Sequence, residues 1–194
     1  MRASATEDAA AVYDAGVVPE APMDAREGGL KPSGEGWFVV NAREAEWVHN
    51  EEFGAGVTFE GRPHFAQFGI NIQVIWPGQP NGYYHAEDGQ EDFLILSGEG
   101  VLLVEGQERP VKAWDFVHFP PKTEHILVGS GDGPCVFLAV GARNAGEGIH
   151  YPVSDVALRH EAGVSQPANS GDEAYVGAPE TTRGPAPDGL FTDR

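Results

Sequence analysis

The feature that most constrains this chain is a series of short apolar runs with a period of two, between residues 35 and 145. In the run at 68–76, the even positions are all apolar, and they alternate with Gly69, Asn71 and Gln73. Turn residues such as Pro77-Gly78 separate successive runs, and no run has a helical period. The 26 Gly and 15 Pro break the chain into short pieces. We therefore predict an all-β protein, either a sandwich or a barrel.

Composition divides the chain into three parts. Residues 1–34 form an N-terminal arm rich in Ala, Gly, Pro and acids, which we expect to be partly disordered, with a short helix at about 7–15. Residues 35–145 carry nearly all the apolar runs and form the predicted single domain. Residues 146–194 form an extended C-terminal arm, in which Ser154 and Gly163 bracket one short predicted helix.

Several predicted strands are apolar on both faces. Residues 93–96 read Phe-Leu-Ile-Leu and residues 101–104 read Val-Leu-Leu-Val. If one face of each strand were exposed to solvent, apolar and polar residues would alternate along the strand. The second apolar face must therefore be covered by the arms or by another subunit. We expect a homodimer.

Charge and targeting signals narrow the possible partners. The 12 Lys+Arg and 30 Asp+Glu give a net charge of −18, which argues against nucleic-acid and anionic-membrane partners. The acidic start lacks the apolar stretch of a signal peptide, and the longest apolar run, Cys135–Val140, is far too short to span a bilayer. We expect a cytoplasmic protein with a small-molecule ligand. The single cysteine excludes an internal disulfide and a Cys-rich zinc site.

Two histidines and two acids form the candidate metal site. His85 and Glu87 are two residues apart on a predicted strand and share one face, and Glu91 follows a tight Asp-Gly turn. His125 follows a hairpin and a Pro-Pro corner, a spacing that lets it return to the same interior. This donor set suits one divalent transition metal, Fe, Mn, Ni, Co or Zn. The alternative is a pair of histidines packed in the core, and a register shift of one residue would replace Glu91 by a neighbouring side chain.

The segment from Gly78 through His85, Glu87 and Glu91 to Gly98 resembles the first cupin motif, and Asp115–His125 resembles the second. The resemblance implies a single-domain double-stranded β-helix, or jelly-roll, barrel. It also implies that His85, Glu91 and His125 take three of the four metal-ligand positions. The chain departs from the motif in having Glu87 in place of the second histidine and Thr123 in place of the glycine in the Pro corner.

Tyr83, His118 and Phe93 are candidate substrate-pocket residues, although packing in the core or against neighbouring strands also explains them. Asn71 and Gln73 are expected to face solvent. No residue can be assigned as catalytic from the sequence.

Three functions remain open. The first is a mononuclear metal-dependent dioxygenase or other oxidoreductase acting on a small molecule, because two histidines and one carboxylate are the ligand set of non-haem iron oxygenases. The second is a metal-dependent isomerase or decarboxylase that uses the ion as a Lewis acid. The third is a non-catalytic module that binds a small ligand or a metal.

Overall fold

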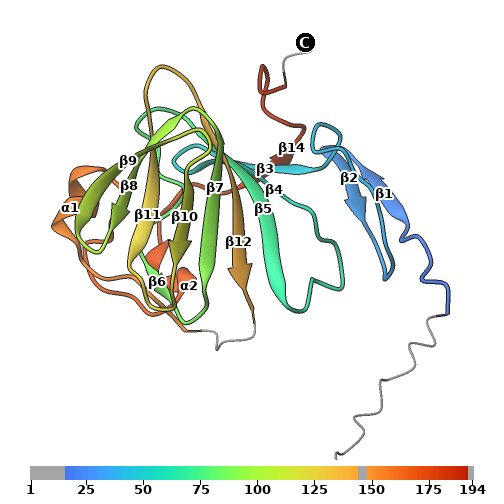
Figure 1. Ribbon diagram of the computed structural model, residues 1–194, viewed down its shortest axis with the longest axis horizontal. Helices are drawn as coiled ribbons and strands as arrows, with labels where there is room; N and C mark the ends of the chain where they lie inside the picture. Colours follow the sequence, from blue (N-terminus) through green and yellow to red (C-terminus); the bar gives the residue numbers. More distant parts are fainter. Residues whose placement is uncertain (1–15, 144–147, 192–194) are drawn as a thin grey trace, which may run out of the picture.

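The structure is a computed structural model, and it describes residues 16–143 and 148–191. Figure 1 shows that strands make up most of its regular secondary structure. The strands are β1 (Met23–Arg26), β2 (Gly29–Pro32), β3 (Trp47–Asn50), β4 (Gly54–Thr58), β5 (Phe68–Ile75), β6 (Ala86–Glu87), β7 (Glu91–Ser97), β8 (Glu99–Val104), β9 (Gln107–Lys112), β10 (Phe116–Phe119), β11 (His125–Ser130), β12 (Cys135–Ala142), β13 (Ile149–His150) and β14 (Thr182–Gly184). The helices of the described residues are α1 (Asp155–Arg159) and α2 (Gly171–Ala174).

Two antiparallel sheets form the body of the molecule. The larger has the order β10-β7-β12-β5-β4-β3-β14, and the smaller has the order β11-β8-β9. In the described residues, strand pairing does not join the two sheets into a closed ring. The all-β prediction is confirmed, and the predicted barrel consists of two sheets that face each other across one core.

That core lies between the inner faces of the two sheets. Phe93 and Ile95 of β7 and Phe137 of β12 are almost fully buried, and they pack with Leu102 of β8 and Leu127 of β11. Alternate residues of the larger sheet therefore point inward, as the period of two requires. This periodicity also decides which polar side chains can enter the interior.

The outer face of the larger sheet carries a second apolar cluster. Val74 of β5 and Val136 of β12 pack there with the fully buried Trp47 of β3. Leu190 and Phe191 of the C-terminal arm cover this cluster, and the rings of Trp47 and Phe191 are 6.3 Å apart. The arm thus supplies part of the second burial surface that the sequence required. The homodimer stays a prediction.

Both arms pack on the domain where the structure describes them. The hairpin β1-β2 lies in the N-terminal arm, and Leu30 pairs with Ala45 in a short parallel bridge. In the C-terminal arm, α1 begins after Ser154, where the sequence predicts one short helix, and α2 is a second helix in the same arm. The predicted helix at 7–15 lies outside the described residues. Neither helix in the described part of the chain has the length or the apolar character needed to cross a membrane.

A buried ion pair fastens the loop between β4 and β5. Glu60 is only 4% exposed, and both of its oxygens accept hydrogen bonds from the Arg143 guanidinium, one of them 2.7 Å long. Glu60 also accepts a bond from the Phe65 amide and lies 3.2 Å from His64. Burial alone would raise the pKa of Glu60, but the hydrogen bonds from Arg143 and Phe65 and the nearby positive charge outweigh it, so the pKa is lowered.

We expect Glu60→Ala to lower the free energy of unfolding by about 2 kcal/mol, because the variant loses the hydrogen bonds that the Glu60 carboxylate accepts from Arg143 and from the Phe65 amide. The pKa of Glu60 is lower in the folded than in the unfolded protein. Its contribution is therefore complete above the unfolded value of about 4.3, and it is lost as the pH falls through the folded value. Urea unfolding at pH 7 and at successively lower pH measures the difference between wild type and variant, which should shrink on acidification.

Glu108→Ala is the matched control, because it breaks an ion pair with Arg159 and His160 that lies at the surface. We expect no measurable change in unfolding there. An equal loss in both variants, or a Glu60 effect that grows on acidification, would contradict the assignment.

Candidate metal centre

The candidate site is built around a pair of backbone hydrogen bonds. The amide of His125 donates to the carbonyl of His85 at 2.8 Å, and the amide of His85 donates back at 3.2 Å. His125 is the first residue of β11, and His85 immediately precedes β6. Residues that face each other in an antiparallel bridge project their side chains to the same side. The two imidazole rings therefore lie with their centroids 5.1 Å apart.

The chain also fixes how each ring is turned. Nδ1 of His85 lies 2.7 Å from the carbonyl oxygen of Tyr83, and Nδ1 of His125 lies 2.9 Å from the carbonyl oxygen of Thr123. A carbonyl oxygen can only accept, so each Nδ1 carries the proton and donates it. In the neutral tautomer this leaves a lone pair on Nε2 of both rings. Many metal-binding histidines are oriented in this way by a backbone carbonyl.

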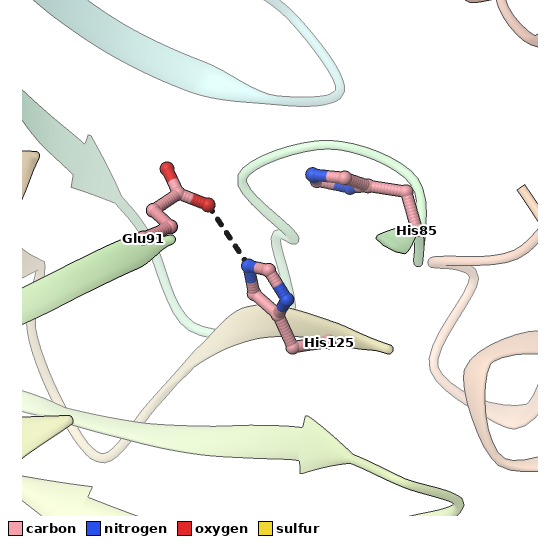
Figure 2. A group of neighbouring side chains, drawn as sticks. All are labelled: His85, Glu91 and His125. Carbon is pink, nitrogen blue, oxygen red and sulfur yellow. Dashed lines mark hydrogen bonds and ion pairs between the residues drawn. The ribbon is translucent and has the colours of Figure 1, made fainter. Parts of the chain in front are cut away.

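Glu91 supplies the third donor. It is the first residue of β7, and it pairs with Gly141 of β12 and Phe119 of β10. Its Oε2 atom is 2.9 Å from Nε2 of His125 (Figure 2). One ligand atom from each of His85, Glu91 and His125 can be chosen so that all three lie within 4.8 Å of one another. The structure thus brings together three of the four predicted ligands.

The contacts of His125 fit a cation at this position. Its two nitrogens each face an acceptor at 2.9 Å, the Thr123 carbonyl and the Glu91 carboxylate. A neutral imidazole has one proton and cannot satisfy both. The ring is only 2% exposed. Metal–ligand bonds of about 2.1 Å at a right angle would place two donor atoms about 3 Å apart, which matches the observed spacing.

Aromatic rings enclose the cluster. Phe119 stacks on the His125 ring at 3.8 Å, and Phe93 meets it edge to face at 5.8 Å. The ring of Tyr151, from the C-terminal arm, lies 5.6 Å from that of His85. Two of these rings come from the inner face and one from the arm. They limit the access of water to the histidines, which strengthens electrostatic interactions there.

Glu87 lies beside the cluster and outside the three-residue group. Its Oε1 atom is 3.6 Å from Nε2 of His85, and its side chain is 36% exposed. The hydrogen bond from His85 lowers the pKa of Glu87 against the opposing effect of burial. Burial by itself would lower the pKa of His85, but the hydrogen bonds to Glu87 and to the Tyr83 carbonyl outweigh it, so that pKa is raised.

The three candidate pocket residues are placed differently from one another. Phe93 lies in the core against His125. Tyr83 stacks on Tyr175 in an aromatic cluster next to the site. His118 pairs with Asp92, and the two contact each other at 2.6 Å. Because its neighbours in β10 point to the core, His118 faces the opposite side of the sheet and is not part of the site.

The corner before His125 explains how Thr123 replaces the expected glycine. The left-handed backbone conformation falls on Lys122, at φ 70°, and not on Thr123. Thr123 can therefore carry a side chain, whose hydroxyl donates to the Pro120 carbonyl at 2.7 Å. Its own carbonyl remains free to orient His125.

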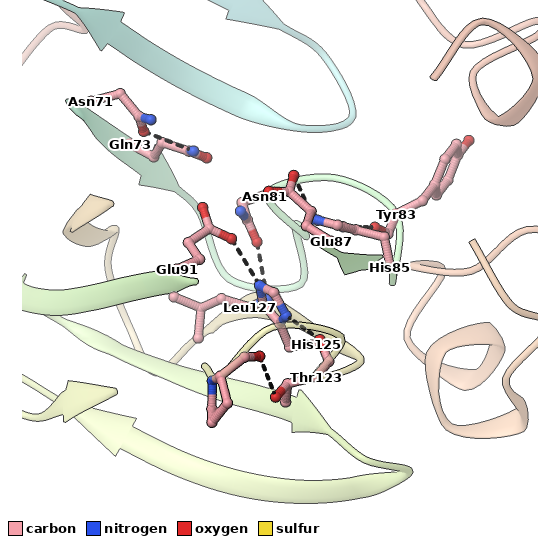
Figure 3. A network of polar contacts seen from close by, with 11 residues as sticks. Asn71, Gln73, Asn81, Tyr83, His85, Glu87, Glu91, Thr123, His125 and Leu127 are labelled. Atoms are coloured by element: carbon pink, nitrogen blue, oxygen red, sulfur yellow. Dashed lines mark hydrogen bonds and ion pairs between the residues drawn. The ribbon is translucent and has the colours of Figure 1, made fainter. Parts of the chain in front are cut away.

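Sequence reasoning missed two polar side chains. Gln73 pairs with Phe137 and Asn71 pairs with Ala139, both of which point into the core. Asn71 and Gln73 therefore project to the inner face, and the expectation that they face solvent is wrong. Figure 3 shows them on the same side of the larger sheet as Glu91. Ile75, two residues after Gln73 on the same face, was the signal that this face is inner.

Comparison with known proteins gives a family match over the residues that contain the candidate site. Residues 71–141 match the family model described as "Cupin domain". Among curated proteins, glucose-6-phosphate isomerase of Pyrococcus horikoshii is 34% identical over 86 residues, 38% of this chain and 46% of that protein. The enzyme of the same name from Pyrococcus furiosus is 28% identical, over 58% of this chain and 67% of that protein. The chain thus spans about half the length of most of these curated relatives.

Solved structures include a sugar phosphate isomerase of the cupin superfamily from Silicibacter pomeroyi. It is 21% identical, with a TM-score of 0.47, over 72% of this chain and 82% of that one.

Proposed function

The chain belongs to the cupin superfamily through residues 71–141, and from this premise we propose that it is a metal-dependent enzyme. His85, Glu91 and His125 would bind one divalent transition-metal ion. The reaction we propose is the isomerisation of a small hydroxy-carbonyl compound. This reaction needs no oxidant or reductant, since one proton moves between adjacent carbons and another between their oxygens.

The observation that carries the metal assignment is the position of His125 between two hydrogen-bond acceptors. The carbonyl of Thr123 fixes Nδ1 as the donor, so Nε2 presents a lone pair to the carboxylate of Glu91. A cation between these two atoms satisfies both of them. Two imidazoles with one carboxylate are ligands that Fe, Mn, Ni, Co and Zn accept.

When bound, the ion would act as a Lewis acid on the oxygens of the substrate. The residues of the chain provide the rest of the environment. The carbonyls of Tyr83 and Thr123 hold the two rings in the binding orientation. Phe93, Phe119 and Tyr151 exclude water around those rings, which keeps the local dielectric low.

Isomerisation is favoured by the relatives, since glucose-6-phosphate isomerases from several archaea match this chain. The matched part is about half of those proteins, so the reaction is carried over as a proposal.

An oxygenase is the second candidate, because the donor set alone equally fits a non-haem iron site. A non-catalytic binding module would use the same cluster without turnover.

We expect the purified protein to bind about one divalent ion per chain, measured by elemental analysis after dialysis against each of the five metals. Glu91→Gln and His125→Ala should reduce the retained metal to a few per cent, because each removes one of the three clustered donors. Glu87→Gln should retain it, because Glu87 lies outside that cluster.

His118→Ala is the control, since this histidine contacts Asp92 on the opposite face. It should bind metal as wild type does. Full retention in His125→Ala would refute the site, and loss in His118→Ala would show that the assay reports nonspecific damage.

For the reaction, we expect metal-loaded protein in D₂O to exchange the proton beside the carbonyl of small hydroxyaldehydes and hydroxyketones, followed by proton NMR. His125→Ala should slow this exchange at least 100-fold, because the ion is lost. An oxygen electrode run on the same samples distinguishes the second candidate. Oxygen consumption that depends on the substrate, without exchange, would overturn isomerisation in favour of the oxygenase.

A further inference from the structure

A cavity of about 320 Å³ opens on the inner face of β3, β4 and β5. Its polar lining includes Asn50, Thr58, Asn71 and Gln73, and Gly54 and Gly56 form part of its floor. None of the described residues that line it is Asp, Glu, Lys or Arg. A cavity of this size holds a small organic molecule, and its lining offers neutral hydrogen-bonding groups.

Two amides in the cavity have hydrogen-bonding capacity to spare. Nε2 of Gln73 donates to Oδ1 of Asn71 at 2.9 Å. Among the described residues, Nδ2 of Asn71 and Oε1 of Gln73 have no hydrogen-bond partner. Polar groups on an otherwise apolar sheet face are costly unless they are paired or wet. Asn71 thus offers a free donor and Gln73 a free acceptor, and the hydroxyl groups of a ligand can bond with both.

Gly56 keeps the space over Gln73 open. It pairs with Gln73 across β4 and β5, and its backbone is not left-handed. A Cβ atom there would lie 3.5 Å from the Ile72 carbonyl oxygen and 3.7 Å from Cγ of Gln73, both ordinary contacts. The fold therefore does not require glycine here, although glycine weakens a strand. Gly54 differs, because it has φ 77° and a Cβ there would lie 2.2 Å from the Val74 carbonyl oxygen.

The cavity and the three-residue cluster lie on the same face of the larger sheet. Strand β12 separates β5 from β7, and its inner residues here are Phe137 opposite Gln73, Ala139 opposite Asn71, and Gly141 opposite Glu91. Oε1 of Glu91 lies 3.9 Å from the position that a Cβ of Gly141 would take. The Glu91 carboxylate thus leans over β12, and the Asn71–Gln73 pair lies on the same side of the sheet in Figure 3.

The charges around this face disfavour an anionic ligand. The nearest arginine on the inner face is Arg143, whose Nη2 would lie 3.0 Å from a Cβ at Gly69. Its guanidinium is already bound by both oxygens of Glu60. A phosphate placed in the cavity would find no Lys or Arg among the lining residues, in a protein of net charge −18.

From these observations we infer that the cavity binds the hydroxyl-bearing part of an uncharged sugar or related polyol, with Asn71 and Gln73 bonding adjacent hydroxyls. This inference rests on the proposed function, because it treats the cavity as the substrate-binding part of the same site. It sets the substrate of this chain apart from the phosphorylated sugar in the names of its relatives.

The test is titration calorimetry on metal-loaded full-length protein with D-glucose, D-fructose and D-xylose, and with glucose 6-phosphate and fructose 6-phosphate. We expect at least one neutral sugar to bind, and each phosphate ester to bind at least fivefold more weakly than its parent sugar. Gly56→Val should lower the affinity for that sugar at least tenfold, because its side chain enters the cavity. Asn71→Leu, which keeps the volume and removes the amide, should lower it by a similar factor.

Gly133→Val is the matched control, because a Cβ at Gly133 meets no atom within 4 Å. It should bind the sugar as wild type does. Thermal unfolding of each variant shows whether it folds, and Asn71→Leu decides the question if Gly56→Val does not.

Three results would overturn the inference: no binding of any neutral sugar, tighter binding of the phosphate esters, or unchanged affinity in a folded Gly56→Val and Asn71→Leu. The metal content of the wild-type protein separates this failure from that of the proposed function. One ion per chain without sugar binding rejects the cavity assignment alone. Sugar binding in a protein that retains no metal rejects the proposed function alone.

Discussion

The site depends on the antiparallel bridge between His85 and His125. Two backbone hydrogen bonds hold these residues directly opposite each other. Because the bridge is antiparallel, their side chains project to the same side of the two paired segments. A shift of one residue would turn Ala86 or Ile126 inward instead. Two residues before each histidine, the carbonyls of Tyr83 and Thr123 bond to Nδ1 of His85 and His125. The same local backbone geometry therefore pairs the two rings and sets their orientation.

The C-terminal arm holds the His85 side of this bridge. The Tyr84 amide donates to the Ala162 carbonyl at 2.7 Å, and the Tyr83 amide donates to the Tyr175 hydroxyl at 2.9 Å. His85 itself precedes a strand of only two residues, which pairs with β13 of the arm. So short a strand has little stability of its own. The position of His85 is therefore a property of the whole chain and not of the domain alone.

Sequence reasoning predicted the strands and the three-residue cluster because both rest on local patterns. The period of two marks strands, and turn residues mark their ends. The motif spacing singled out His85, Glu91 and His125, whose donor atoms the structure brings within 4.8 Å of one another, and Glu87 lies just outside this group. The sequence could not predict that Glu87 lies outside the group, because Glu87 shares a strand face with His85. Which of the two acids reaches His125 depends on the conformation of the turn before β7.

The prediction for Asn71 and Gln73 was wrong for a different reason. An alternating strand has one apolar and one polar face, and the apolar face is normally assigned to the core. In β5 the apolar face packs instead on Trp47 and the C-terminal arm, contacts far apart in sequence. The polar face of β5, with Asn71 and Gln73, therefore points to the interior. Only the pairing of β5 with β12 reveals this, because it aligns Gln73 with the buried Phe137.

This inversion gives the inner face two chemically distinct halves. One half holds Glu91 and the two histidines, where a cation would satisfy the facing acceptor atoms of Glu91 and His125. The other half holds neutral amides and glycines around a cavity. Strand β12 separates the halves, with Ala139 opposite Asn71 and Gly141 opposite Glu91. A ligand that spans both would place its reacting oxygens at the cluster and its hydroxyls at the amides, and strand register would set the distance between them.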